Sequence, residues 1–152
     1  MEVLIIYTSY SGSNHFVAEA IYNQLKTKYT VTYKQADQTT IKDLEKADLI
    51  LMGAPSWTFD GKEGQPSSPM SKLLQKAESL NLENKQFALF GCGDSSYTYL
   101  CGAVDVMEQF VHKTNATLAL ESLRIDKFYD NYDHNIQLAQ QWASKIIPAA
   151  AN

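Results

Sequence analysis

Small, polar and aromatic residues are concentrated in the segment 91–102, between an apolar run at 87–90 and an amphipathic stretch at 103–111. Small residues let backbone N–H groups come close to a ligand, and a tyrosine offers a flat surface for stacking. The segments 9–14 and 54–60 are similar in character and also follow apolar runs. Ligands of open parallel sheets bind beyond the carboxyl ends of the strands, so the three segments predict one shared binding site.

The segment 9–14 has the composition of a phosphate site without a cation. Hydroxyls of Ser9, Ser11 and Ser13 could surround an anion, together with the N–H groups at the start of a following helix. The segment lacks both the lysine of a P-loop and the three glycines of a dinucleotide fingerprint. It therefore fits one terminal phosphate. The alternative is that Ser13 or Asn14 only caps the helix.

Trp57 and Tyr97 each lie in one of the other two segments. Two aromatic rings beside a phosphate site would enclose a flat, apolar heterocycle, and Tyr99 would pack beside it. Each ring also has a simpler interpretation. Trp57 could be a surface aromatic or a plug of its loop, Tyr97 could belong to the core, and Tyr99 could be a core residue at a helix start.

Apolar runs and amphipathic stretches alternate along the whole chain. We expect strands at 3–7, 30–35, 48–53, 86–91 and 117–120, the last continuing at 123–125 after the polar pair 121–122. We expect helices at 14–28, 40–46, 70–77, 100–114 and 131–147, and a long loop at 54–69. This alternation predicts a doubly wound α/β sheet with helices on both faces and right-handed crossovers.

The composition narrows the class of protein. The chain has 152 residues, 45% of them hydrophobic and 20% charged, and a formal net charge of −4. We expect one domain over residues 1–148 and a C-terminal tail at 149–152. The negative charge argues against nucleic acid as a partner. No apolar run reaches the roughly 20 residues of a membrane span, and the N-terminus is expected to be a strand rather than a signal peptide. Two cysteines favour the cytoplasm and give no metal site.

Several segments together resemble the short-chain flavodoxins. These are residues 7–14, 56–57, 91–97, 101–105 and 123–126, in the same order as in that family. The resemblance implies a five-stranded parallel sheet of order 2-1-3-4-5. It also implies noncovalently bound FMN and a low-potential one-electron carrier that is not an enzyme. Such a carrier is a monomer whose redox partner proteins dock near the flavin edge.

Family roles transfer to matching positions. Ser9 and Ser11 would hold the phosphate, with Gly12 giving backbone access, while Ser13 and Asn14 stand where Asn and Thr are usual. The complete set of expected FMN contacts is Ser9, Tyr10, Ser11, Gly12, Ser13, Asn14, Pro55, Ser56, Trp57, Thr58, Cys92, Gly93, Asp94, Tyr97, Tyr99 and Cys101.

Some of these positions have a specific expected role. The rings of Trp57 and Tyr97 would flank the isoalloxazine ring. Asp94 would accept a hydrogen bond from the pyrimidine edge, or alternatively cap its own loop. Cys92 and Cys101 read as small buried hydrophobic residues rather than redox thiols, because no basic neighbour or C-x-x-C spacing activates them.

Two features concern the redox potential. Carboxylates at Asp60, Glu63 and Asp94 would oppose the negative charge of the reduced ring and lower the potential of the second reduction step. Flavodoxins commonly carry Gly directly after the tryptophan, whereas Thr58 and Phe59 are expected to occupy this turn here. A positive φ at such residues costs on the order of 1 kcal/mol.

Three other classes of protein are alternatives to this interpretation, and the first two of them share the same sheet topology. An FMN-dependent NAD(P)H:quinone reductase would need a second pocket over the ring and usually a dimer. A phosphorylated receiver domain would need acidic residues after the first and third strands, where Ser9, Gly53 and Ala54 stand. A structural adaptor would not need three segments rich in hydrogen-bond donors.

Overall fold

In the computed structural model, a parallel sheet forms the centre of the molecule. The structure describes residues 1–59 and 61–151, and the side chains of all of these except 59 and 147–151. The strand order is β2 (Thr30–Gln35), β1 (Glu2–Tyr7), β3 (Leu49–Gly53) and β6 (Gln86–Gly93). At the far edge, β7 (Thr117–Leu118) and β8 (Leu123–Asp126) both pair with β6. The expected order 2-1-3-4-5 is confirmed, because the two short strands together form the fifth position.

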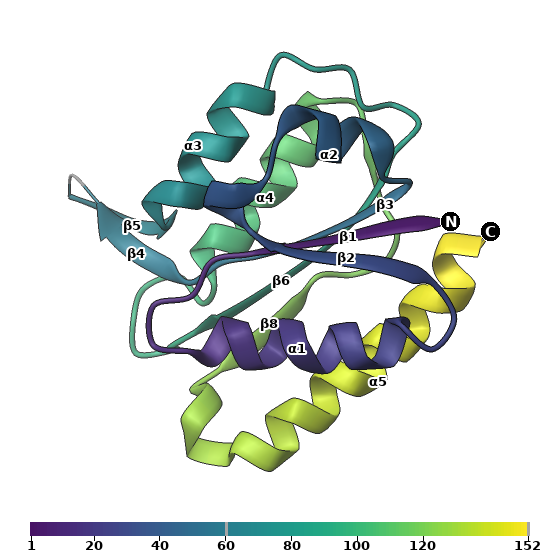
Figure 1. Cartoon of the computed structure of the whole chain (residues 1–152). Helices are drawn as coiled ribbons and strands as arrows, with labels where there is room; N and C mark the ends of the chain where they lie inside the picture. Colours follow the sequence, from purple (N-terminus) through teal and green to yellow (C-terminus); the bar gives the residue numbers. More distant parts are fainter. Residues whose placement is uncertain (60, 152) are drawn as a thin grey trace.

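The apolar runs form the central strands because both faces of the sheet are covered by helices (Figure 1). Helices α1 (Ser13–Leu25) and α5 (Tyr132–Ala151) cover one face. Helices α2 (Ile41–Lys46), α3 (Ser68–Ala77) and α4 (Gly102–Lys113) cover the other. Every residue of β3 is buried, as expected for a strand between two helical layers.

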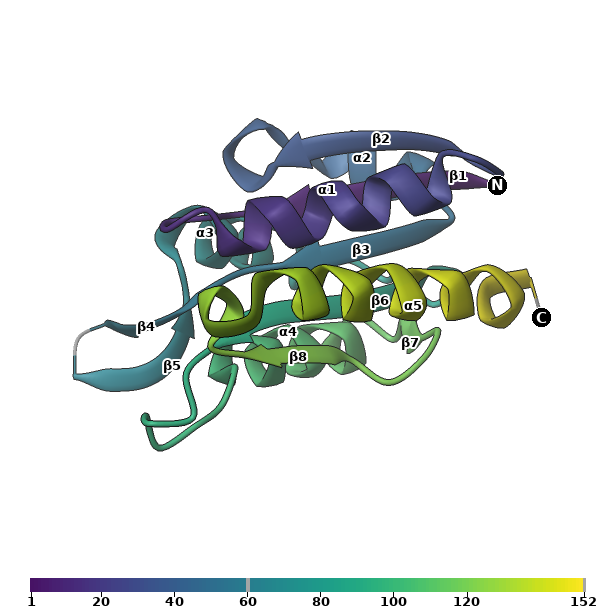
Figure 2. The ribbon, with the colours of Figure 1, turned by 90° about the horizontal axis from the view of Figure 1, so that it is seen from below.

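The predicted long loop at 54–69 is wrong in part, because it contains a β-hairpin. Strands β4 (Ser56–Phe59) and β5 (Lys62–Pro66) pair antiparallel and project beyond the carboxyl edge of the sheet (Figure 2). Gly61 and Gly64 both have a φ of 76°, a left-handed conformation that glycine adopts without steric cost. These glycines make the chain reversal and the irregular strand pairing possible. The Gly and Pro content of the segment, taken alone, had indicated a loop.

Several element boundaries shift from their predicted positions. Helix α4 begins after Cys101, whose left-handed φ of 55° ends the preceding loop, rather than at residue 100. Helix α3 starts earlier than expected, since Pro69 is accommodated in its first turn. Helix α5 extends past 147 to Ala151, into the predicted tail, and Asn152 lies outside the described residues.

The last strand is interrupted as the polar pair 121–122 suggested. Between β7 and β8 the chain leaves β6, and the carbonyl of Glu121 accepts a hydrogen bond of 2.8 Å from Nε1 of Trp142 on α5. Two short 3₁₀ segments, Ala36–Gln38 and Phe128–Asn131, complete the fold; we refer to the second by its label η2. Within the described part of the chain, no helix has the length and apolar character that a membrane span requires.

Candidate functional site

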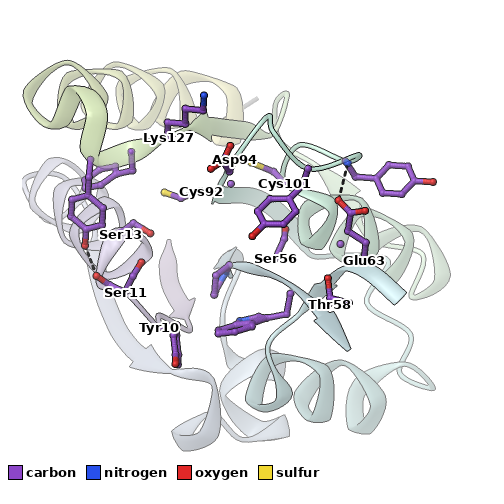
Figure 3. A pocket seen from close by; sticks show the side chains of 18 of the residues that line it. Tyr10, Ser11, Ser13, Ser56, Thr58, Glu63, Cys92, Asp94, Cys101 and Lys127 are labelled. Carbon is purple, nitrogen blue, oxygen red and sulfur yellow. Dashed lines mark hydrogen bonds between the residues drawn. The ribbon is translucent and has the colours of Figure 1, made fainter. Parts of the chain in front are cut away.

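A cavity of about 640 Å³ opens at the carboxyl edge of the sheet, where the three predicted segments meet. Most of the predicted site residues line it: Tyr10, Ser11, Ser13, Pro55, Ser56, Trp57, Thr58, Cys92, Gly93, Asp94, Tyr97, Tyr99 and Cys101. Figure 3 shows labelled side chains from all three segments approaching the same hollow. The volume is within the range of small-molecule and cofactor sites.

Three predicted residues lie beside this cavity instead of lining it. Ser9 lines a neighbouring cavity of about 360 Å³ that also contacts Tyr10, Trp57 and Thr58. Gly12 directly precedes α1, and Asn14 is in its first turn. Both therefore belong to the framework of the first segment.

The segment 9–14 is held by hydrogen bonds to both the N–H and the C=O of the peptide group between Ser11 and Gly12. Gly12 has a φ of 93° and donates its N–H to Oγ of Ser9 at 3.1 Å. The carbonyl of Ser11 accepts a hydrogen bond from the hydroxyl of Tyr129. Gly12 is the N-cap of α1 and no side chain caps this helix, so the interpretation of Ser13 or Asn14 as a simple cap is wrong.

Two buried nitrogen donors have no hydrogen-bond partner among the described residues: Nδ2 of Asn14 and Nε1 of Trp57. The Asn14 amide is oriented by its other end, since Oδ1 accepts a hydrogen bond from the N–H of Cys92 at 3.3 Å. A buried donor without a partner costs about 1–3 kcal/mol. Both nitrogens thus call for an acceptor that the described residues do not provide.

The aromatic residues are presented to the cavity rather than to the core. Trp57 is half-buried, and Tyr10 packs edge-on against it with ring centroids 4.4 Å apart. Tyr97 and Tyr99 are 63% and 59% exposed, so the interpretation of either as a core residue is wrong. Two exposed rings on one cavity wall leave flat apolar surface for a ligand.

Carboxylates from three segments hold the loop that carries these tyrosines. Asp126 accepts the N–H of Ser95 at 2.8 Å, and Glu63 accepts the N–H of Thr98 at 2.6 Å. Asp94 lines the cavity, but its Oδ1 accepts both the N–H and the hydroxyl of Ser96, at 2.8 and 2.6 Å. The loop-capping interpretation of Asp94 is therefore confirmed.

These hydrogen bonds also act on the charge of Asp94. Ser96 holds the pKa of the Asp94 carboxyl below its ordinary value, because both of its hydrogen bonds favour the ionised form. Asp94 therefore remains an anion at the rim of the cavity at neutral pH.

Two glycines allow the hairpin to approach α4 closely. A Cβ placed on Gly102 would lie 2.6 Å from Cα and 2.9 Å from the carbonyl oxygen of Gly64. Ser56 adds a hydrogen bond, since its Oγ accepts the N–H of Ala103 at 2.9 Å. The base of the hairpin is thus fixed to the start of α4, and with it the cavity wall that contains Trp57.

We expect Gly102→Ala to lower the free energy of unfolding by about 1–3 kcal/mol, the usual cost of overpacking a close contact. Urea unfolding monitored by circular dichroism measures this change. Gly61→Ala is a suitable control, because its Cβ meets nothing within 4 Å and only the left-handed φ opposes it. A Gly102→Ala protein as stable as wild type would show that the hairpin moves aside freely.

The two cysteines behave as small buried residues, as expected. Burial raises the pKa of Cys92 to about 12 and that of Cys101 to about 11. Both thiols are therefore protonated at neutral pH, and both are free. No group of three or more His, Cys, Asp or Glu residues that could hold a metal occurs in ranges 1–59 and 61–151.

Sequence reasoning missed one wall of the cavity. Gly64, Lys127, Phe128, Tyr129 and Asp130 line it as well. Four of these residues directly follow β8, at the same carboxyl edge as the other loops. The sequence already predicted that the last strand ends at residue 125, so the rule that predicted the site from the other strands could have assigned this wall as well.

The expected position of Thr58 and Phe59 in a turn is wrong. Both residues belong to β4, and the left-handed residues of the hairpin are Gly61 and Gly64. Asp60, expected among the nearby carboxylates, lies outside the described residues. The predicted strain of a β-branched residue in the turn is thus absent from Thr58 in this structure.

Comparison of the sequence and of the structure with known proteins finds similarity to flavodoxins in each case. The flavodoxin family model matches residues 5–142. A flavodoxin of Nitratidesulfovibrio vulgaris is 33% identical over 149 residues, covering 97% of each chain. The solved structure of a Streptococcus pneumoniae flavodoxin superimposes with a TM-score of 0.85 at 21% identity, covering 97% of this chain and 99% of that one. A Fusobacterium nucleatum flavodoxin, solved with flavin mononucleotide bound, has a TM-score of 0.83 at 15% identity over 97% of each chain. The chain belongs to the flavodoxin family, whose members are FMN-carrying electron-transfer proteins rather than enzymes.

Proposed function

We propose that the 640 Å³ cavity holds the FMN of this electron carrier, with the phosphate at the segment 9–14 and the ring between Trp57 and Tyr97. The observation that carries this assignment is the pair of buried donors, Asn14 Nδ2 and Trp57 Nε1, that find no acceptor in the described chain. A phosphorylated ligand would supply acceptors to both. The exposed aromatic rings fit the flat part of the same ligand.

The phosphate would be held by neutral donors. Among the residues described along the cavity, Lys127 is the one Lys or Arg, and it follows β8 rather than the segment 9–14. Hydroxyls of Ser9, Ser11 and Ser13, backbone N–H groups and the positive end of the α1 dipole remain for the phosphate. Many hydrogen bonds in a partly buried site can compensate for the missing cation.

When bound, FMN supplies the redox chemistry, and the chain binds, orients and tunes it. Trp57 and Tyr97 would exclude water from the two ring faces. The carboxylates Glu63 and Asp94 line the cavity and would make a negative charge on the reduced ring less favourable. This arrangement lowers the potential of the second reduction step relative to free FMN.

A quinone reductase is less well supported. Hydride transfer from a nicotinamide would need one ring face open to a second substrate, whereas Trp57 and Tyr97 would cover both. No residue is required to act as acid, base or nucleophile in an electron carrier.

Redox partners would dock at the rim of the cavity. Tyr97 and Tyr99 are exposed there beside Glu63 and Asp94, and the chain carries a net charge of −4. This surface suits a basic partner that meets a monomer in the cytoplasm, where the two free thiols would stay reduced. Electron transfer from such a partner should then slow with rising ionic strength.

The proposal is tested by reconstituting purified apoprotein with FMN and recording its visible absorption. Bound flavin gives two bands whose positions shift from those of the free cofactor, and the flavin fluorescence is quenched by the flanking rings. An apoprotein that leaves the FMN spectrum and fluorescence unchanged contradicts the assignment of the cavity.

We expect Glu63→Ala to weaken FMN binding about fivefold, or about 1 kcal/mol, because the amide of Thr98 then loses its acceptor. Glu63→Gln keeps an oxygen acceptor, so its affinity should stay within about twofold of wild type. Its second reduction potential should nevertheless rise, since a charge has been removed. Fluorescence titration and redox titration of both variants measure these effects. Equal affinities of the Ala and Gln variants would exclude a role for the hydrogen bond.

A further inference from the structure

The backbone carbonyl of Ser11 is fixed by a residue from the opposite end of the chain. The hydroxyl of Tyr129, in η2, donates a hydrogen bond to this oxygen. A Cβ on Gly12 would lie 3.0 Å from the same hydroxyl, which shows how closely Tyr129 covers the peptide between Ser11 and Gly12.

This contact sets the orientation of a peptide in the segment 9–14. In a trans peptide the C=O and N–H groups point in opposite directions. With its carbonyl held by Tyr129, the peptide directs the Gly12 N–H toward Oγ of Ser9, at 3.1 Å. The Ser9 oxygen is then an acceptor for Gly12, so its own O–H proton is available to another acceptor.

The same contact protects the site from an unfavourable charge. A carbonyl oxygen that turned into a ring of donors would present a partial negative charge to a bound phosphate. The hydroxyl of Tyr129 holds this oxygen at η2, outside the donor set. Backbone N–H groups can then converge on the anion, as in other phosphate nests.

Tyr129 is placed by contacts that do not depend on the segment 9–14. The N–H of Lys127 donates to the carbonyl of Gly93 at 2.8 Å. The adjacent Phe128 is 3% exposed, and its carbonyl accepts a hydrogen bond of 2.9 Å from Nδ2 of Asn135. The 3₁₀ segment is therefore fixed to β6 and α5, and it can act as a rigid support.

We propose that Tyr129 is a positioning residue for the phosphate site, and that its hydroxyl contributes to the preference for FMN over riboflavin. The inference rests on the proposed function of the cavity. It predicts an effect on the phosphate end of the ligand and little effect on the ring.

The test compares the affinities of apoprotein for FMN and for riboflavin, which lacks the phosphate, in wild type and in Tyr129→Phe. We expect the ratio of the two affinities to fall about tenfold in the variant, mainly through weaker FMN binding. Tyr132→Phe is the matched control, because this neighbouring tyrosine packs edge-on against Phe16 and Phe128. Its ratio should equal that of wild type. Tyr129→Leu also lacks the hydroxyl and should show the same fall.

The possible outcomes distinguish a failure of the phosphate site from a failure of the role of Tyr129. A wild-type protein that binds both ligands equally contradicts the phosphate site itself, and with it this inference. A wild type that prefers FMN, together with an unchanged ratio in both Tyr129 variants, overturns only the role of Tyr129. An equal loss of both affinities also overturns it, since a general effect on the cavity would lower both alike.

Discussion

Asn14→Asp is expected to weaken FMN binding at least a hundredfold, or about 3 kcal/mol, while changing riboflavin binding far less. The substitution preserves size and keeps an oxygen for the Cys92 N–H, which Oδ1 now accepts at 3.3 Å. It replaces the unpartnered donor Nδ2 with a second acceptor. A carboxylate in this buried position would oppose the phosphate, both by its charge and by the loss of a donor.

Titration of the apoprotein with each flavin measures the two affinities. Urea unfolding of the apoprotein provides the control, because Asn14 is fully buried and a carboxyl there affects the fold as well. Riboflavin binding close to that of wild type would show that the cavity is intact. If FMN and riboflavin lose affinity in parallel, Asn14 serves the fold and not the phosphate.

Trp57→Ala is expected to weaken FMN binding at least thirtyfold, about 2 kcal/mol, and to raise the second reduction potential. The variant removes a half-buried aromatic surface and a buried donor together. It also leaves Tyr10 without the ring against which it packs at 4.4 Å. Water then reaches the flavin more easily and stabilises negative charge on the reduced ring.

Trp57→Phe separates these contributions, since it keeps an aromatic face but has no ring nitrogen. Its second potential should stay near that of wild type, and its affinity should lie between those of wild type and Trp57→Ala. Redox titration and fluorescence titration supply both quantities. Unchanged potential and affinity in Trp57→Ala would contradict the proposed stacking.

Sequence reasoning predicted the parts of the site that follow from the order of strands and loops. Buried strands read as continuous apolar runs, so β1, β3 and β6 could be recognised, and the loops at their carboxyl ends could be assigned to one site. The roles of individual residues were harder to predict. Asp94 was expected either to meet the ligand or to cap its own loop, and spacing cannot decide between the two roles. In the structure its Oδ1 accepts hydrogen bonds from Ser96, while the residue also lines the cavity.

The hairpin, and the contact of Tyr129 with the segment 9–14, were missed for a different reason. The strands β4 and β5 are short and rich in polar residues, and their pairing depends on left-handed glycines and on the contact of Gly64 with Gly102. Tyr129 reaches the first loop across 118 positions of the chain. Such long-range contacts leave no periodic pattern in the sequence.

The interrupted edge strand has a consequence for local opening of the molecule. Between β7 and β8, Glu121 is hydrogen-bonded to Trp142, so the sheet edge and α5 share a contact. Segments joined in this way tend to exchange their amide protons as one cooperative unit. η2 lies between β8 and α5 and carries Phe128 and Tyr129. Local opening of this C-terminal unit would therefore expose the wall of the cavity that Phe128 and Tyr129 form.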